Sequence, residues 1–185
     1  MYQSLRLLLL IALAACLLLA SATNGLACSS ASKEANDPRL LLAGADVIVR
    51  AVAVTYHGHY EGKEPAGEEV IPPLVEFKVL EVLKGEDVPE LLHAPGQLIG
   101  VDDFNPPTMP LHSIRPTGRG GSCYAYYYKK GGEFLLVLRK KGSELTPYWA
   151  SMAATNQQLR GADDPWLHWV RQQLLSAGAS EGRQM

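Results

Sequence analysis

The stretch Leu74–Lys84 (LVEFKVLEVLK) constrains the fold more than any other part of the chain. It begins with apolar residues that alternate with charged ones, the period-two pattern of a strand with one buried face. After Val79 the phase slips, because Leu80 and Val82 become the apolar set while Glu81 faces away. A β-bulge causes such a slip, and bulges bend strands into barrels. We therefore expect a bulge or sharp bend between Val79 and Glu81, and three residues buried on one side: Val75, Phe77 and Val79.

The rest of the chain predicts further strands between two helices. Ala45–Tyr56 is rich in Val and Ile and favours a long strand. Asp37-Pro38 and Asp164-Pro165 each combine an N-cap residue with proline at the first helical position, which predicts helices ending near Gly44 and Ser176. The patterns predict four more strands, with Lys129–Gly132 as a hairpin-like connection: Leu98–Phe104, Cys123–Tyr128, Glu133–Lys140 and Leu145–Ala153.

This order of elements is compatible with one architecture in particular. Strands separated by long Gly- and Pro-rich connections, with 12 Pro and 17 Gly in all, favour short strands over long helices. We expect a mainly β fold: a five-stranded OB-like Greek-key barrel with a short N-terminal helix and a C-terminal helix.

Composition excludes several functional classes. The 185 residues are 47% apolar and 19% charged, unlike a disordered chain, and the length suits one domain. Seventeen Lys and Arg residues stand against 19 Asp and Glu residues, and the isoelectric point is near 6.2. A nucleic-acid partner is not expected, because such binding needs clustered basic residues in excess.

The N-terminus has the pattern of an export signal. One positive charge precedes an apolar run of 14 residues, Leu7–Ala20, which is shorter than the roughly 20 residues of a membrane span. Cleavage is expected after Ala27, or failing that after Ala22; lipid anchoring through Cys16 or Cys28 is the alternative.

The expected organisation is a signal peptide at 1–27, the barrel domain at 28–160, and a C-terminal helix with a polar tail at 161–185. The mature protein would be secreted or periplasmic, with no membrane span.

Removal of the signal leaves two of the three cysteines, Cys28 and Cys123. An even number in an oxidising compartment predicts one disulfide, and two free thiols are the alternative. Closing a loop of 95 residues would stabilise the fold by roughly 4 to 5 kcal/mol in the chain-entropy model.

Several segments together resemble a known family. A cysteine stands at the expected mature N-terminus in Cys28-Ser29-Ser30, and Cys123 precedes Gly132–Val137 (GEFLLV). Between them lie Ala45–Val49 (ADVIV) and Val75–Val79 (VEFKV), and Leu83-Lys84-Gly85 follows the latter. Over about Cys28–Leu159 the chain resembles the netrin-like domain, whose best-known members are the tissue inhibitors of metalloproteinases. Ser30 stands where the family usually has a further cysteine, and the inhibitors' second, Cys-rich domain is absent from this sequence.

The resemblance implies a protein-binding module without enzymatic activity. In the inhibitors, the amine and carbonyl oxygen of the N-terminal cysteine chelate the open position of a catalytic zinc. Carried over, Cys28 would be the chelator, Ser29 would enter the protease subsite, and Cys123 would be the anchor. The expected partner is a secreted zinc metalloprotease or another envelope protein, and no cofactor is expected. A structural or lipid-anchored envelope module is the alternative function.

Other combinations of polar and aromatic residues are weaker. His57 and His59 could bind a metal with Glu61, yet exposed loop histidines are the simpler interpretation. Neighbouring residues on a strand point to opposite faces, so Asp102 and Asp103 are not expected to share a proton. The tyrosines within Tyr124–Tyr128 are expected to form an aromatic strand of the barrel core.

Overall fold

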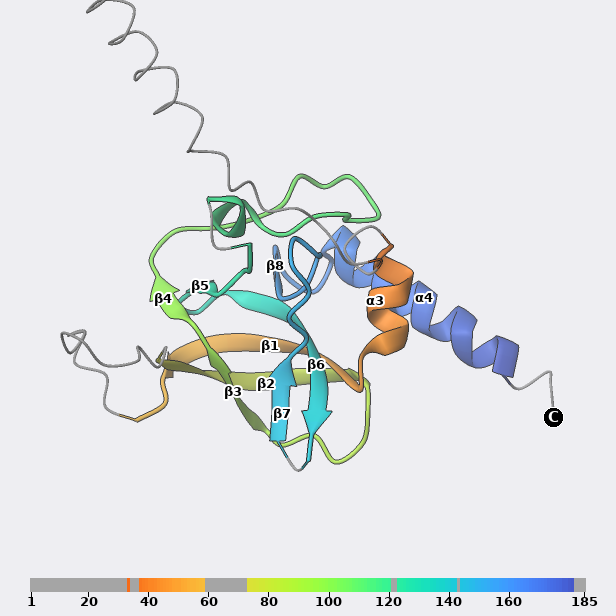
Figure 1. The fold of residues 1–185 in the computed structure, drawn as a ribbon, viewed down its shortest axis with the longest axis horizontal. Helices are drawn as coiled ribbons and strands as arrows, with labels where there is room; N and C mark the ends of the chain where they lie inside the picture. The colour runs from red at the N-terminus through yellow and green to blue at the C-terminus, as the bar shows by residue number, and fades with distance from the viewer. Residues whose placement is uncertain (1–32, 34–36, 59–72, 121–122, 143, 182–185) are drawn as a thin grey trace, which may run out of the picture.

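Five antiparallel strands curve into a nearly closed barrel, with one short helix before them and one longer helix after them (Figure 1). The computed structural model describes residues 33, 37–58, 73–120, 123–142 and 144–181. The described elements follow in chain order: α3 (Pro38–Gly44), β1 (Val47–Tyr56), β2 (Leu74–Lys84), β3 (Leu91–Pro95), β4 (Gln97–Ile99), η2 (Pro116–Arg119), β5 (Tyr127–Lys129), β6 (Glu133–Lys141), β7 (Glu144–Pro147), β8 (Gln157–Leu159) and α4 (Pro165–Glu181).

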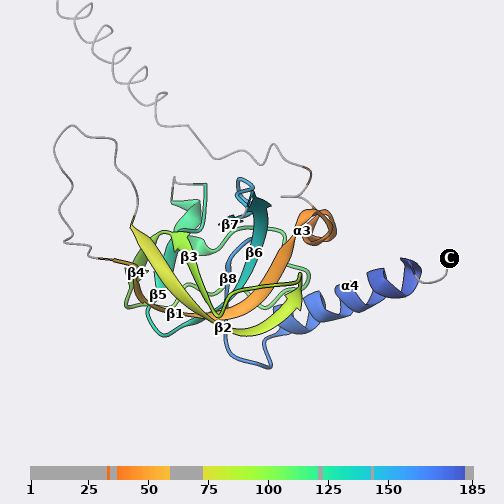
Figure 2. The same ribbon diagram turned by 90° about the horizontal axis from the view of Figure 1, so that it is seen from below.

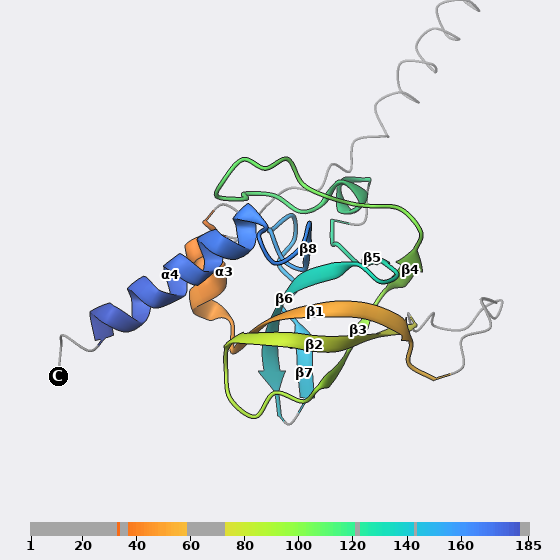
Figure 3. The same cartoon turned by 180° about the vertical axis from the view of Figure 1, so that it is seen from behind.

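The strand order is that of an OB-like Greek key. The strand order of the main sheet is β3-β2-β1-β6-β7. Contacts between its two outermost strands, β3 and β7, nearly close the sheet into a barrel. The short β8 adds to β6, while β4 and β5 form a separate parallel pair. The predicted fold class is confirmed, and Figure 3 shows the same barrel from behind.

The predicted bulge in β2 is present. Arg50 of β1 pairs with Glu81 and Ala51 pairs with Val79, which leaves Leu80 without an opposite residue. Val75 and Phe77 are fully buried, and Val79 is half-buried against the same core.

The prediction that Leu80 and Val82 form the apolar set beyond the bulge is wrong. Their side chains are 44% and 45% exposed. Val79 packs instead against the buried cluster that contains Phe77, and Leu83 packs against a second cluster that contains Trp166. The bulge shifts the pairing with β1 between these two residues.

Two hydrophobic clusters share the strands of the barrel. Inside the barrel, the rings of Phe77, Tyr128 and Phe134 meet edge to face at centroid distances between 4.8 and 6.0 Å. The second cluster lies under the helices, where Trp166 of α4 packs with Leu41 of α3. Helix α4 is therefore part of the same packed body as the barrel.

Both helices begin as the sequence predicts. The carboxylates of Asp37 and Asp164 accept hydrogen bonds from the backbone N–H groups two residues later, at 2.9 and 2.8 Å. Helix α4 continues past the predicted end at Ser176 and extends beyond the barrel (Figures 1 and 2). Among the residues that the structure describes, no helix has both the length and the apolar character needed to cross a membrane.

Three predicted strands were misplaced. The third barrel strand is Leu91–Pro95, which was not predicted, and Leu98–Phe104 contributes only the short β4. Likewise, Cys123–Tyr128 and Leu145–Ala153 shrink to β5 and β7. The turn at Lys129–Gly132 exists, but β5 pairs with β4 rather than with β6, so it does not join a hairpin. Much of the misassigned chain instead winds across one end of the barrel (Figure 1).

Candidate functional site

Of the residues predicted to contact a protease, Cys28 and Ser29 lie outside the described residues. Their roles and the pairing of Cys28 with Cys123 therefore stay predictions. Cys123 itself is held by its backbone: its N–H donates to Gly118 at 3.1 Å, and its carbonyl accepts from Met152 at 3.0 Å. These bonds place Cys123 between the η2 loop and the segment that follows β7.

An apolar hollow begins one residue beyond Cys123. Its volume is about 520 Å³, and we name its four lining residues the aromatic patch: Pro95, Tyr124, Tyr126 and Trp149. Tyr124 and Trp149 meet edge to face with ring centroids 5.8 Å apart, and they are 39% and 37% exposed. Grouped, partly exposed aromatic side chains of this kind are suited to contact with another protein.

The aromatic patch corrects a prediction about the tyrosines. Only Tyr128 is in the barrel core, whereas Tyr124, Tyr126 and Tyr127 are exposed or half-buried. The regular strand begins only at Tyr127, so the residues before it do not alternate into the barrel. Ala125 is buried, while Tyr124 and Tyr126 line the surface beside Pro95 at the end of β3.

A glycine holds this segment close to β3. The N–H of Gln97 donates to the carbonyl of Tyr126 at 2.8 Å, directly after Gly96. A Cβ atom at Gly96 would overlap the carbonyl oxygen of Tyr126 and the ring of Tyr128. Glycine is therefore required for the close approach that brings Tyr126 beside Pro95.

A buried arginine holds the loop from the inside. Arg115 is fully buried, and Nη1 lies 2.7 Å from Asp103 Oδ2. The guanidinium also donates to three backbone carbonyls, at 2.7 to 3.2 Å: Ala125, Tyr127 and Asn156. Two of these carbonyls flank Tyr126, so Arg115 fixes the backbone that carries the aromatic patch.

The electrostatics of Arg115 follow from its surroundings. Burial lowers the pKa of its guanidinium below the ordinary value, while Tyr128 and Asp103 act in the opposite direction. The guanidinium also stacks over the rings of Tyr128 and Phe134, at 5.4 and 5.2 Å from their centroids. This role of Arg115 could not be predicted from the sequence, because the residue lies in a Pro- and Gly-rich connection without a periodic pattern.

The two neighbouring aspartates face different partners, as expected. Asp102 is exposed and pairs with Lys129 at 2.8 Å, and the hydrogen bond from this lysine lowers the pKa of the Asp102 carboxyl. Asp103 is buried against Arg115. The pair therefore does not offer two carboxylates that share a proton.

One predicted metal-ligand candidate has unexpected neighbours. His57 lies beside Glu76 and His93, and a possible ligand atom from each of the three lies within 4.8 Å of the others. The partners considered from sequence, His59 and Glu61, lie outside the described residues. Sequence spacing could not identify Glu76 and His93, because pairing of the strands brings them to His57.

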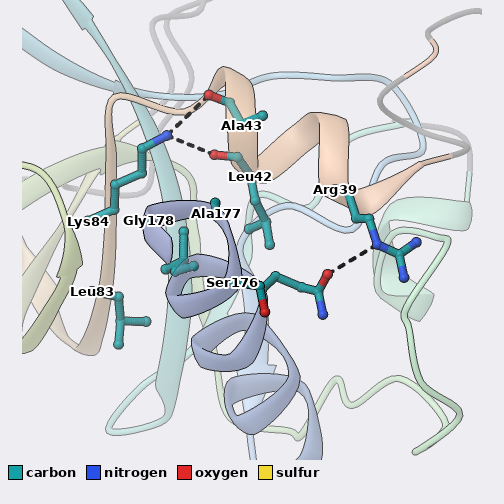
Figure 4. A pocket seen from close by; sticks show the side chains of 10 residues that line it. Arg39, Leu42, Ala43, Leu83, Lys84, Ser176, Ala177 and Gly178 are labelled. Atoms are coloured by element: carbon teal, nitrogen blue, oxygen red, sulfur yellow. Dashed lines mark hydrogen bonds between the residues drawn. The ribbon is translucent and has the colours of Figure 1, made fainter. Parts of the chain in front are cut away.

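The groove between the two helices has a structural explanation. It has a volume of about 660 Å³ and lies between α3, α4 and the end of β2 (Figure 4). Lys84 donates to the carbonyls of Leu42 and Ala43 at 3.0 and 3.1 Å, and Arg39 donates to Gln173 at 3.1 Å. These bonds satisfy the C-terminal carbonyls of α3 and join the helices, so they account for the polar groups around the groove.

No model of a known protein family matches the chain, and no curated protein matches it. The resemblance to the netrin-like domain therefore stays a hypothesis.

Proposed function

We propose that this protein is an exported, non-enzymatic protein-binding module that contacts its partner at the Cys123 end of the barrel. The observation that carries the proposal is the aromatic patch beside Cys123. Tyr and Trp are enriched at the centres of protein interfaces, where they dominate the binding energy. Arg115 and Gly96 hold the backbone of the patch in place, which lowers the entropy lost on binding.

The sharpest form of the proposal is inhibition of a zinc metalloprotease. Cys28 would be the mature N-terminus, its amine and carbonyl oxygen would chelate the partner's zinc, and Ser29 would enter the adjacent subsite. A disulfide to Cys123 would anchor this end. The aromatic patch adjoins Cys123 in the chain, so it would widen the contact with the protease.

An inhibition assay tests this form directly. The residual activity of a panel of zinc endopeptidases is measured against purified mature protein whose N-terminus has been verified as Cys28. Inhibition should fall sharply when one alanine is added ahead of Cys28, because the extension removes the five-membered chelate and leaves the core unchanged. Trp149→Ser should weaken inhibition through the aromatic patch, whereas His168→Gln, on the exposed surface of α4, should not.

Absence of inhibition across the panel, with Cys28 verified as the first residue, would contradict the inhibitor proposal. The alternative would then be a structural envelope module or, where Cys16 or Cys28 carries lipid, an anchored one. Equal inhibition by the extended and native chains would show that binding does not use the N-terminal chelate.

A further inference from the structure

We propose that His57, Glu76 and His93 form a binding site for a divalent transition-metal ion of the zinc class. The site would lie on the outer face of the barrel, where β1, β2 and β3 are consecutive neighbours in the sheet (Figure 3). Each of the three segments contributes one ligand. This inference is independent of the proposed protease contact.

Antiparallel pairing brings two of the ligands together. Glu76 of β2 is directly opposite His93 of β3, and residues opposite each other in a sheet project from the same face. The neighbours of Glu76 along the strand, Val75 and Phe77, are fully buried inside the barrel. Glu76 and His93 therefore belong to the outer face.

A second bulge brings His57 to the same face. Ala53 pairs with Phe77 and Thr55 pairs with Glu76, so Val54 has no opposite residue. Beyond this bulge Tyr56 packs into the barrel core, and His57 is exposed on the other face. Without the extra residue the alternation would turn His57 towards the interior.

The ladder between the strands continues as far as His57. Its N–H donates to the carbonyl of Leu74 at 2.8 Å, so its backbone remains attached to β2. Bulges often re-aim a side chain next to a functional site, and this bulge places an imidazole beside two other metal-ligating groups.

The distances are close to those that a metal ion requires. Nε2 of His93 lies 3.6 Å from Oε2 of Glu76, and the two imidazole rings lie 3.8 Å apart between centroids at an angle of 40°. A tetrahedral zinc ion with bonds of about 2.0 to 2.2 Å separates its ligand atoms by about 3.3 to 3.6 Å. The separation between His93 and Glu76 already fits, whereas ligand atoms as far as 4.8 Å apart would approach by about 1 to 1.5 Å and the two imidazole rings would turn away from each other.

One ligand atom lacks a hydrogen-bond partner. Nε2 of His93 is shielded from solvent and, among the residues that the structure describes, forms no hydrogen bond. Four other buried side-chain atoms of the described residues also lack a partner, but His93 Nε2 is the one that lies in a group of potential metal ligands. Coordination to a metal would satisfy the lone pair on this nitrogen.

The ligand set favours zinc over the alkaline-earth ions. Two imidazoles and a carboxylate suit Zn²⁺, whereas Ca²⁺ and Mg²⁺ prefer sets made entirely of oxygen. A groove of about 450 Å³ adjoins both imidazoles, because His57 and His93 line it together with Leu74 and Leu91. A fourth coordination position is therefore within reach of water or of a ligand from solution.

Zinc titration of the purified mature protein tests the proposal, with a chromogenic chelator as competitor. The expected result is one ion bound per chain, with affinity reduced by about tenfold or more in each of His57→Gln, Glu76→Gln and His93→Gln. His168→Gln is the matched control, because His168 is an exposed histidine outside the cluster, and it should bind zinc as the native protein does. Circular dichroism establishes that each variant is folded.

A thermal measurement gives a second readout. Zinc should raise the melting temperature of the native protein and of His168→Gln, but not that of His93→Gln. The proposal is overturned if the native protein binds no zinc, if it binds zinc no more tightly than the His57→Gln and His93→Gln variants, or if the control loses affinity to the same extent.

Discussion

The guanidinium of Arg115 and the histidine cluster, which consists of His57, Glu76 and His93, lie on the same barrel and differ in how well their nitrogen atoms are satisfied. Arg115 is fully buried, and every nitrogen of its guanidinium donates a hydrogen bond. His93 is only half-buried, yet its Nε2 is shielded from solvent and forms no hydrogen bond among the described residues.

The difference separates a structural role from a binding role. A buried guanidinium whose nitrogens all donate hydrogen bonds fixes the backbone around it, and it has no donor left for a ligand. Side chains that can ligate a metal, face one another and include a nitrogen without a hydrogen bond can still coordinate an ion. Arg115 therefore supports the aromatic patch from inside, while the histidine cluster is itself a place for an ion.

Removal of the buried arginine should have the largest effect on stability. Arg115→Met removes the cation beside the buried Asp103 carboxylate, which keeps only Thr117 among its donors, and removes the guanidinium donor of three carbonyls. We expect a loss of about 3 to 5 kcal/mol in the free energy of unfolding, measured by urea denaturation. Arg39→Met is the control: among the described residues its exposed side chain bonds to Gln173 and stacks on Trp169, and the loss should be within about 1 kcal/mol. Similar losses in the two variants would contradict the structural role of Arg115.

Tyr128 gives the same network a pH signature. Burial raises the pKa of its hydroxyl from 10.0 to about 12, although Arg115 opposes the shift. Between pH 10 and about 12 the folded state keeps the hydroxyl proton, whereas the unfolded chain loses it. The contribution of this hydroxyl to the free energy of unfolding is therefore full below pH 10 and is lost as the pH rises to about 12. Two pKa units correspond to roughly 2 to 3 kcal/mol.

Tyr128→Phe should therefore flatten the fall in unfolding free energy between pH 10 and 12. Near pH 7 the variant should unfold much as the native protein does, because the ring contacts with Phe77 and Phe134 are kept. An unchanged alkaline slope in urea denaturation would show that the hydroxyl titrates normally.

The two regions also differ in how far the sequence predicts them. Local patterns locate Leu74–Lys84 with its observed bounds, the bulge at Leu80 and both Asp-Pro helix starts. Each of these depends on residues within one turn or one strand, where alternation and capping act directly.

The polar groupings escape such patterns because they form between distant segments. Arg115 meets Asp103 and Asn156 only after the connection has crossed the end of the barrel. Strand pairing and a bulge at Val54 bring His57 to Glu76, and the apolar pattern of Ala45–Tyr56 shows no phase slip that would predict this bulge. Leu91–Pro95 was missed because it is short and ends in proline, although an outermost strand of the sheet tolerates both features.

The smallest effect should come from the histidine cluster when no metal is present. His93→Gln should change the free energy of unfolding by less than about 1 kcal/mol, because it removes only a partly exposed group with a long contact to Glu76. It should also leave any inhibition of a protease unchanged. A large loss of stability in metal-free protein would mean that the cluster is structural, as the Arg115 network is.

Non-reducing peptide mapping of the mature protein by mass spectrometry tests the central claim most directly. We expect a chain whose first residue is Cys28, with a free amine and a disulfide to Cys123, beside the aromatic patch. A chain that begins at Thr23, a lipid on Cys16 or Cys28, or free thiols at Cys28 and Cys123 would contradict it.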